Sequence, residues 1–360
     1  MHKVTLSPGD WIGPELCTVV QHVVKKVGVD IDWDIQPMLK GEITDSLLSS
    51  CRATGLVFKS RVDAPRQVGV LPPTLELRKQ LGVWCSVRPI RALPNVGAKH
   101  PNIDIVVIRE VSEDIYSGLE HEVTKDVYEA VKITTPSACE KISRYAYQYT
   151  VENGRDFESW MLDPDTGAWV PEMIKDPETG EEKSKKRKRL TIVHKSNIMK
   201  KSDGLFLNTA RKIGEEYKDT VETWDSIADA LCTNLVRTPE KFNVLLTGNL
   251  FGDIVSDLCS GLAGGITASP SISYGSFEDK PIVVFENLHG KVPELVGTDQ
   301  YNPIPMLNVL IHLLRHIEEE RAADKIEAGI RTLLQRGIKT KDLGGTTLCS
   351  EFVERLIEQF

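Results

Sequence analysis

The sequence predicts an α/β protein with a largely parallel β-sheet, and two observations predict it. Short apolar runs of strand length alternate with helix-compatible segments along most of the chain, as in proteins built from strand–helix–strand units. The chain also has 360 residues, which is enough for a large core and for more than one lobe.

The first strand is expected at Lys3–Leu6, and a loop leads from it into a helix with Pro14 near its first turn, where proline is well tolerated. This helix has one apolar face, formed by Leu16, Val19, Val20, Val23 and Val24. Apolar or alternating runs predict further strands at 30–35, 55–58, 102–109, 190–193, 242–246 and 282–285. Helices are expected at 74–81, 137–149, 225–235 and towards the C-terminus.

Composition excludes several classes of protein. The net charge of −8 argues against a general binder of nucleic acids or acidic membranes. The seven cysteines are scattered without CxxC spacing, which indicates a reducing compartment and neither a disulfide framework nor a zinc site. No apolar run is as long as a membrane span, and no signal peptide precedes the first expected strand. We expect a protein of the cytoplasm or, after removal of a targeting segment, of the mitochondrial matrix.

A pair of acids follows the expected strand at 242–246. Asp253 and Asp257 are four residues apart in a helix-compatible stretch, so both carboxylates would lie on one helical face. Neighbouring carboxylates repel each other unless a cation lies between them, and Mg²⁺ or Mn²⁺ prefers such oxygen ligands. The spacing alone is explained equally well by acids that stabilise the start of a helix.

One segment, 156–188, interrupts the alternation because it is polar and rich in turns. It contains two similar turns, 163–167 and 176–180, and is expected to form a surface β-hairpin or flap. A basic run follows from Lys183 to Arg189. A nucleic-acid or nuclear-targeting motif is one interpretation of this run, and a solvated basic flank is the favoured one.

Several motifs follow one another along nearly the whole chain outside 156–188: Ser7-Pro8-Gly9-Asp10-Trp11-Ile12-Gly13-Pro14-Glu15, Val87-Arg88-Pro89, Ile108-Arg109-Glu110, Ser112–Gly118, Val193–Lys200, Asn249–Asp257, His289-Gly290 and Asn302-Pro303. Together, and in this order, they resemble the isocitrate and isopropylmalate dehydrogenases. The fragments 194–200 and 202–207 resemble the NAD-dependent isocitrate dehydrogenases most.

The resemblance implies a two-lobed fold with a mixed, largely parallel sheet, which is not a Rossmann fold. Both chain ends would form a large domain, 1–86 with 264–360. The small domain would comprise 87–118 and 137–263, with 156–188 as a surface insertion. A clasp arm at 119–136 would hold a second subunit, and the active site would lie between the lobes and be completed by that partner. A homodimer is therefore the smallest expected assembly.

The resemblance also implies a metal-dependent oxidative decarboxylation of isocitrate to 2-oxoglutarate, a reaction of the tricarboxylic acid cycle. Mg²⁺ or Mn²⁺ would hold the substrate's hydroxyl and adjoining carboxylate. Hydride would pass to NAD, and the β-keto acid would lose CO₂. Arginines pair with carboxylates bidentately, so Arg78, Arg88 and Arg109 would hold the substrate. Each of the three could instead form a structural ion pair.

Further roles follow from the resemblance. Asp229 of the partner subunit would join Asp253 and Asp257 on the metal; it stands among apolar neighbours and would otherwise be costly to bury. Lys195, assisted by Asp229, would remove the hydroxyl proton, because burial near cations lowers the pKa of a lysine and leaves it neutral, as a base must be. Tyr116 would protonate the enol carbon, unless it is simply a packed aromatic. The cofactor would be held by His289, Gly290, Glu294, Leu295 and Asn302, with Glu294 selecting NAD over NADP.

Departures from the family pattern leave other substrates open. Trp11 replaces a usual glycine, and 63–68 differs from the usual segment near the nicotinamide, where Val68 lacks a hydroxyl. Pro72 and Thr74 stand where isocitrate dehydrogenases carry Ser and Asn. The alternatives are the same chemistry on isopropylmalate, homoisocitrate, D-malate or tartrate, and a catalytically silent regulatory subunit. The retained metal acids argue against the silent subunit.

Overall fold

The computed structural model describes residues 2–38, 41–63, 71–164, 166–176, 179–265, 269–287 and 292–360. The chain forms two compact units: unit 1 contains Met1–Asp104 and Asp253–Phe360, and unit 2 contains Ile105–Gly252. The expected boundaries lay at 86/87 and 263/264. Residues 87–104 and 253–263, which were expected in the small domain, therefore belong to unit 1. The first difference arises because β4 (Cys85–Arg91) pairs with β16 (Ser271–Phe277) inside unit 1.

Unit 1 contains six sheet strands in the order β4-β16-β17-β3-β1-β2. Four of these strands are parallel to one another: β1 (His2–Ser7), β2 (Ile31–Ile35), β3 (Leu56–Lys59) and β17 (Lys280–Glu286). β16 is antiparallel to both β17 and β4, so the sheet is mixed as expected. The sequence predicted neither β4 nor β16.

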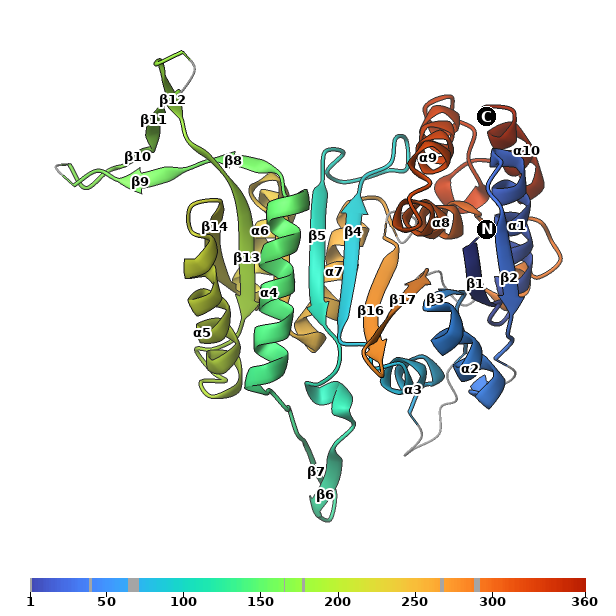
Figure 1. Ribbon diagram of the computed structural model, residues 1–360, viewed down its shortest axis with the longest axis horizontal. Coiled ribbons are helices and arrows are strands. Elements are labelled where there is room, and N and C mark those ends of the chain that lie inside the picture. Colours follow the sequence, from blue (N-terminus) through green and yellow to red (C-terminus); the bar gives the residue numbers. More distant parts are fainter. Residues whose placement is uncertain are drawn as a thin grey trace. The chain divides into compact units, whose positions relative to one another are not determined.

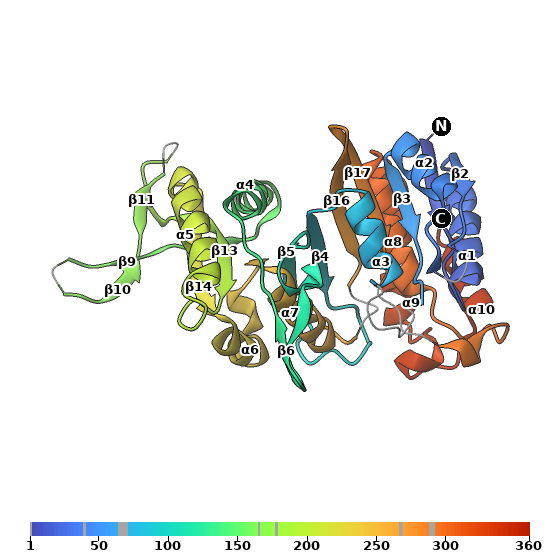
Figure 2. The ribbon, with the colours of Figure 1, turned by 90° about the horizontal axis from the view of Figure 1, so that it is seen from below.

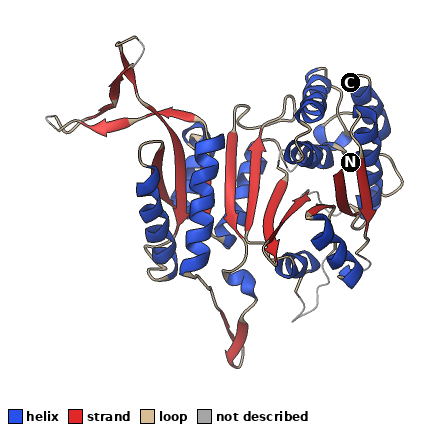
Figure 3. Ribbon diagram, in the orientation of Figure 1, coloured by secondary structure: helices blue, strands red, loops and turns tan. Residues whose placement is uncertain are grey.

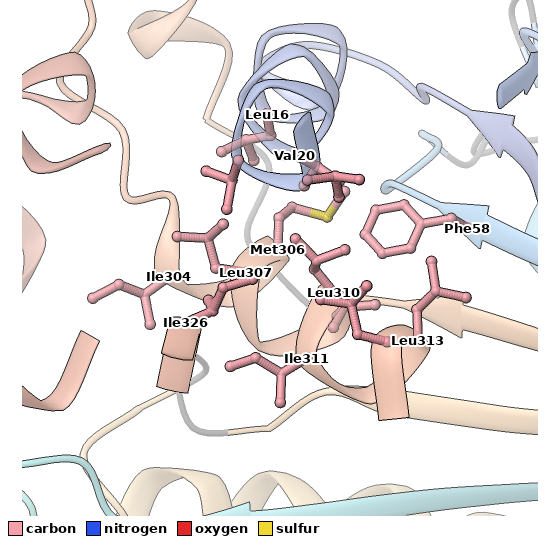
Figure 4. Close-up of a cluster of buried hydrophobic side chains, with 14 of the residues drawn as sticks. Leu16, Val20, Phe58, Ile304, Met306, Leu307, Leu310, Ile311, Leu313 and Ile326 are labelled. Atoms are coloured by element: carbon pink, nitrogen blue, oxygen red, sulfur yellow. The ribbon is translucent and has the colours of Figure 1, made fainter. Parts of the chain in front are cut away.

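The main core of unit 1 lies between its sheet and four helices: α1 (Gly13–Val27), α8 (Ile304–His316), α9 (Glu320–Gln335) and α10 (Cys349–Ile357). Figure 4 shows Leu16 and Val20 of α1 facing Met306 and Leu307 of α8, with Phe58 of β3 at the side. Each of these side chains is shielded almost completely from solvent, which is the main favourable term in folding. Two further helices, α2 (Asp45–Thr54) and α3 (Pro73–Gln80), also belong to unit 1.

Unit 2 is built on four parallel strands in the order β14-β13-β15-β5. They are β14 (Val221–Ile227), β13 (Lys186–His194), β15 (Val244–Thr247) and β5 (Asp104–Glu110). α4 (Pro136–Asn153) and α5 (Ser202–Gly214) cover one face of β13 and β14, and α6 (Ala228–Arg237) covers the other (Figure 2). The helix expected at 225–235 begins only at Ala228, because Asp225–Ile227 complete β14. Throughout the described residues, no helix is long and apolar enough to cross a membrane.

A two-stranded hairpin of β6 (Glu120–Thr124) and β7 (Val127–Ala130) projects from unit 2 (Figure 1). Every residue of both strands is exposed in the single chain. Its apolar side chains are exposed too: Leu119, Val123, Val127, Tyr128 and Val131. The hairpin occupies the segment in which the clasp arm was expected, and its apolar surface is the kind that marks a contact with another chain.

The segment 156–188 forms two hairpins on a common base rather than one flap (Figure 3). The first pairs β9 (Trp160–Leu162) with β10 (Trp169–Pro171), and the second pairs β11 (Met173–Lys175) with β12 (Glu182–Ser184). Three residues spaced 13 apart close a ring of backbone hydrogen bonds at the base. Ser159 N–H donates to Lys185, Lys185 N–H to Glu172, and Glu172 N–H to Ser159, over 2.8, 2.7 and 2.8 Å.

The ends of 156–188 belong to the sheet of unit 2, since β8 (Asp156–Glu158) pairs antiparallel with β13 at Lys186–Lys188. The basic run along β12 and β13 is neutralised by neighbouring acids. Its ion pairs are Lys183–Asp176, Lys185–Glu172, Arg187–Glu172, Lys188–Asp156 and Arg189–Glu222. This pairing supports the solvated basic flank over a nucleic-acid surface.

Candidate functional site

Unit 1 carries a hollow of about 320 Å³ with a strongly polar wall. The wall includes four of the predicted site residues that fall in unit 1: the metal acids Asp253 and Asp257 and the substrate clamps Arg78 and Arg88. The remaining lining residues are Lys59, Arg61, Val62, Thr74, Ser260, Ser269, Glu286 and Asn287.

The two acids lie on one face of α7 (Asn249–Leu262), as their spacing predicted. Nη1 of Arg88 lies 3.3 Å from Asp253 Oδ1 and 3.8 Å from Asp257 Oδ1, and Arg88 also donates to the Ser256 hydroxyl. The Arg88 side chain is buried, whereas those of Asp253 and Asp257 are 38% and 76% exposed. The guanidinium therefore reduces the repulsion between two carboxylates that remain open to solvent.

Arg78, on α3, donates to Glu286 at the end of β17, and Lys59 Nζ lies 3.2 Å from the other Glu286 oxygen. Burial by itself raises the pKa of Glu286, but the charges of Arg78 and Lys59 outweigh it and lower that pKa to about 2. Arg78 is thus held in a buried ion pair as well as lining the hollow. Lys59 also approaches the Thr74 hydroxyl at 3.4 Å.

In unit 2, the ammonium of Lys195 is hydrogen-bonded to Asp229. Lys195 directly follows β13, and Asp229 stands in the first turn of α6, so the parallel pairing of β13 with β14 brings the two together. The bond from Lys195 lowers the pKa of Asp229. In the single chain Asp229 is 71% exposed, and it is the partner that Lys195 has among the described residues.

Buried groups fix the backbone around Lys195. Its N–H donates to Asp203 Oδ2 over 2.6 Å. The preceding His194 lies 3.2 Å from Asp225 through Nε2, and its Nδ1 is 2.9 Å from the Ser196 hydroxyl. The Lys195 backbone is therefore positioned, while the side chain can move towards a substrate.

Arg109, at the end of β5, faces Tyr116 and Asn249. Its guanidinium donates to Asn249 Oδ1 from Nε at 3.0 Å and from Nη2 at 2.7 Å, and its centre lies 5.1 Å from the Tyr116 ring centroid. Gly252 is required beside it, because a Cβ there would lie 2.6 Å from Arg109 Cγ and 2.4 Å from the Thr247 hydroxyl. Unit 2 thus contains two clusters of predicted site residues, Arg109 with Tyr116 and Lys195 with Asp229.

Lys132 joins two buried carboxylates that hold these groups in place. Its ammonium lies 3.0 Å from Asp203 Oδ1 and 3.3 Å from Asp114 Oδ2. Asp114 in turn accepts from the N–H of Ile115 and from that of Leu250 in α7. Asp114 adopts the left-handed φ of +77°, which is uncommon for a residue other than glycine and marks a constrained turn.

The cofactor positions proposed from the resemblance are only partly described. His289 and Gly290 lie outside the described residues. Glu294 and Leu295 belong to a short 3₁₀ helix, Pro293–Leu295, in which Glu294 is exposed. Asn302 donates to Asp342 Oδ2 over 2.9 Å and accepts from the N–H of Ile304 at the start of α8. Leu295 packs against the core of unit 1.

A divalent ion fits the donor set of unit 1. Asp253 and Asp257 present carboxylate oxygens from one helical face beside a polar hollow, which suits a hard cation. Within the described residues, no group of three or more His, Cys, Asp or Glu side chains is arranged to hold a metal. A complete coordination shell therefore needs further oxygen donors, such as substrate, water or another carboxylate.

Sequence reasoning missed several residues that shape these sites. Lys59 had a usable signal, since it ends a buried strand as Arg109 does. Asn249 and Asp203 stood inside quoted motifs but received no role. The others missed were Asp114, Lys132, Glu286 and Asn287, whose importance depends on contacts between distant parts of the sequence.

Comparisons with known proteins agree with this geometry. The family model described as "Isocitrate/isopropylmalate dehydrogenase" matches residues 3–159 and 179–356. The chain is 34% identical to a probable isocitrate dehydrogenase [NAD] subunit alpha, mitochondrial, of Drosophila melanogaster, covering 98% of this chain and 86% of that protein. It is 32% identical to a chloroplastic 3-isopropylmalate dehydrogenase of Solanum tuberosum, covering 93% and 86%.

A solved structure gives the same result. The isocitrate dehydrogenase from Methylococcus capsulatus superposes with a TM-score of 0.83 at 31% identity, over 100% of this chain and 99% of that one. Its fold is therefore that of the present chain, an α/β fold with a mixed, largely parallel sheet. The gap in the family match, 160–178, falls within the two hairpins. The chain belongs to the isocitrate/isopropylmalate dehydrogenase family.

Proposed function

We propose that this protein catalyses the metal-dependent oxidative decarboxylation of isocitrate to 2-oxoglutarate with NAD as hydride acceptor. The observation that carries the proposal is the hydrogen bond between Lys195 and Asp229. A lysine held by a carboxylate suits removal of a proton from a hydroxy acid. A silent regulatory subunit would have no need of this set or of the metal acids.

The charges in the unit 1 hollow favour isocitrate among the family's substrates. The wall carries four cationic side chains, Lys59, Arg61, Arg78 and Arg88, and three carboxylates, Asp253, Asp257 and Glu286. A bound divalent cation would bring the net charge to three positive, which matches the three carboxylates of isocitrate. Isopropylmalate has two carboxylates and an apolar group, and Val62 is the one aliphatic residue lining the described wall.

In the proposed reaction, Arg88 and Arg109 hold substrate carboxylates and Lys195 accepts the hydroxyl proton. The neutral amine of Lys195 is the form that takes this proton, and Asp229 stabilises the ammonium that results, because the two side chains are already hydrogen-bonded. Tyr116 delivers a proton to the carbon that has lost CO₂. Asp253 and Asp257, with Asp229 of the partner subunit, would hold Mg²⁺ or Mn²⁺, which would lower the pKa of the substrate hydroxyl and stabilise negative charge as CO₂ leaves.

Cofactor preference follows from Glu294, which is exposed and free to meet a ribose. A carboxylate accepts hydrogen bonds from both ribose hydroxyls and repels a 2′-phosphate. The cofactor residues His289, Gly290, Leu295 and Asn302 complete this part of the proposal. Family members work as dimers with shared active sites, and the exposed apolar β6–β7 hairpin suits the contact with a second copy.

The direct test measures NADH formation with Mn²⁺ and a panel of acids: isocitrate, isopropylmalate, homoisocitrate, D-malate and tartrate. We expect isocitrate to give the highest kcat/KM, and NAD to exceed NADP by at least about tenfold, or roughly 1.4 kcal/mol. A higher kcat/KM for isopropylmalate or D-malate would overturn the substrate while preserving the chemistry. No turnover of any of the five would favour the silent subunit.

A further inference from the structure

The side-chain amide of Asn287 is buried and has no hydrogen-bond partner. It directly follows Glu286 at the end of β17 and is 5% exposed. Among the described residues with buried unsatisfied side-chain polar atoms, Asn287 alone has two such atoms, the donor Nδ2 and the acceptor Oδ1. Leaving a buried polar group unpaired costs about 1–3 kcal/mol, so native proteins rarely retain such a side chain without a use for it.

The position of Asn287 indicates what that use is. It lines the unit 1 hollow, which also has two other unsatisfied buried donors on its wall, the Ser269 hydroxyl and Arg78 Nε. The neighbouring Glu286 differs, since both of its carboxylate oxygens are paired with Arg78 and Lys59. Several unsatisfied polar groups therefore line the same hollow, and a polar ligand bound there would satisfy them.

The chemistry of the amide narrows the ligand. A carboxylate offers only acceptors, so it would pair with Nδ2 and leave Oδ1 facing another negative oxygen. A hydroxyl offers a single donor and would not satisfy both atoms with good geometry. A primary carboxamide presents one NH₂ and one carbonyl side by side, and two such groups form a reciprocal pair of hydrogen bonds.

We propose that Asn287 recognises the carboxamide of the nicotinamide ring and thereby fixes which face of the ring meets the substrate. This inference rests on the proposed use of NAD. It places the ring beside the hollow that holds Asp253, Asp257 and Arg88, where the substrate's hydroxyl carbon would lie.

The test varies both residue 287 and the nucleotide, and it measures the dissociation constant of each combination. The dimeric protein is titrated with NADH and with reduced 3-acetylpyridine adenine dinucleotide, in which a methyl group replaces the NH₂, and Kd is read from nucleotide fluorescence. We expect the native protein to prefer NADH by about tenfold, because the analogue leaves Oδ1 unpaired. In Asn287→Leu this preference should fall at least threefold, mainly through weaker NADH binding.

Two variants act as controls. Ser273 on β16 also has a buried unsatisfied hydroxyl but does not line the hollow, so Ser273→Ala should leave the preference unchanged. Asn287→Asp keeps the shape of the side chain and accepts from the NADH amide but repels the acetyl oxygen, so it should widen the preference. This variant also decides the matter if Asn287→Leu does not fold.

The outcomes separate this inference from the proposed function. An unchanged preference in Asn287→Leu or Asn287→Asp overturns the inference, as does a raised KM for isocitrate with an unchanged NADH preference, which would assign Asn287 to the substrate carboxylate. Absence of NADH binding by the native protein would refute the proposed cofactor itself. The inference is supported only when NADH binds and the preference shifts in the two opposite directions.

Discussion

The ammonium of Lys132 lies 3.0 Å from Oδ1 of Asp203, and this ion pair ties the base of the β6–β7 hairpin to the turn that carries Lys195. The same ammonium reaches Asp114, which holds the turn of Tyr116 and the first N–H groups of α7. Lys132 is therefore a positioning residue for both proton-transfer groups, although it belongs to neither. Because the hairpin has an exposed apolar surface, contact with a second chain would act on this same junction.

Replacing Lys132 by Met should impair catalysis through geometry. The substitution leaves two buried carboxylates without their cation, which costs about 3–5 kcal/mol in stability. We expect a kcat reduced at least about tenfold with a smaller change in KM, and partial recovery in Lys132→Arg, which restores the charge. Stopped assays at several pH values, with folded protein, measure kcat and KM. A purely structural role would lower the melting temperature and leave the pH profile of kcat unchanged.

Glu286 predicts how stability depends on pH. Its folded pKa, about 2, lies below the ordinary value of 4.5, so the Glu286 carboxylate stabilises the fold above about pH 4.5 and this contribution is lost as pH falls towards 2. Glu286→Gln should therefore cost about 3 kcal/mol or more at pH 7, since Arg78 and Lys59 lose their buried partner. The difference from the native protein should shrink between pH 5 and pH 2. Urea unfolding at several pH values measures it, and a constant difference would contradict the ion-pair account.

Asp253→Asn should remove metal binding while leaving the fold intact. The Asp253 side chain is 38% exposed and its partner Arg88 retains Asp257 and Ser256, so little stability is lost. We expect at least about a hundredfold weaker binding of Mn²⁺ with isocitrate present, measured by calorimetry, and activity close to zero. Asp324→Asn, which alters an exposed carboxylate paired with Arg315 on the helices α8 and α9, is the matched control. Full turnover by native protein after exhaustive chelation would refute the metal site.

Sequence reasoning located most strands because apolar runs at β1, β3, β5, β15 and β17 carry a strong local signal. It missed β4 and β16, whose residues alternate polar with apolar, and it extended a helix back into β14. The acid pair Asp253 and Asp257 was found because helical spacing places both on one face. Lys132 could not be found this way, because its role depends on carboxylates that folding brings close to it. Asn287 could not be found either, because its role depends on the absence of a hydrogen-bond partner in the folded chain.

The two hairpins at 160–184 should be dispensable for chemistry. The family match leaves out 160–178, most of this segment, and β8 and β13 pair with each other beneath the base of the hairpins. Removing them takes little from the core, because their apolar side chains Trp160, Met161, Met173 and Ile174 are 38–51% exposed. The Lys185 and Arg187 pairs with Glu172 would be lost, and partly exposed pairs contribute at most about 1 kcal/mol each.

We therefore expect a chain in which a short Gly-Ser turn joins Ser159 to Lys185 to keep its fold and its pH profile of kcat. Arg187 should hold the new turn, because it donates to the Ser159 hydroxyl and to the Lys218 carbonyl independently of the hairpins. Glu172→Gln, which weakens the base without deleting the hairpins, is the control for the lost ion pairs. Circular dichroism, thermal melting and steady-state kinetics measure the result. Unfolding of the shortened chain, with Glu172→Gln still folded, would show that the ring of Ser159, Glu172 and Lys185 is part of the structural core.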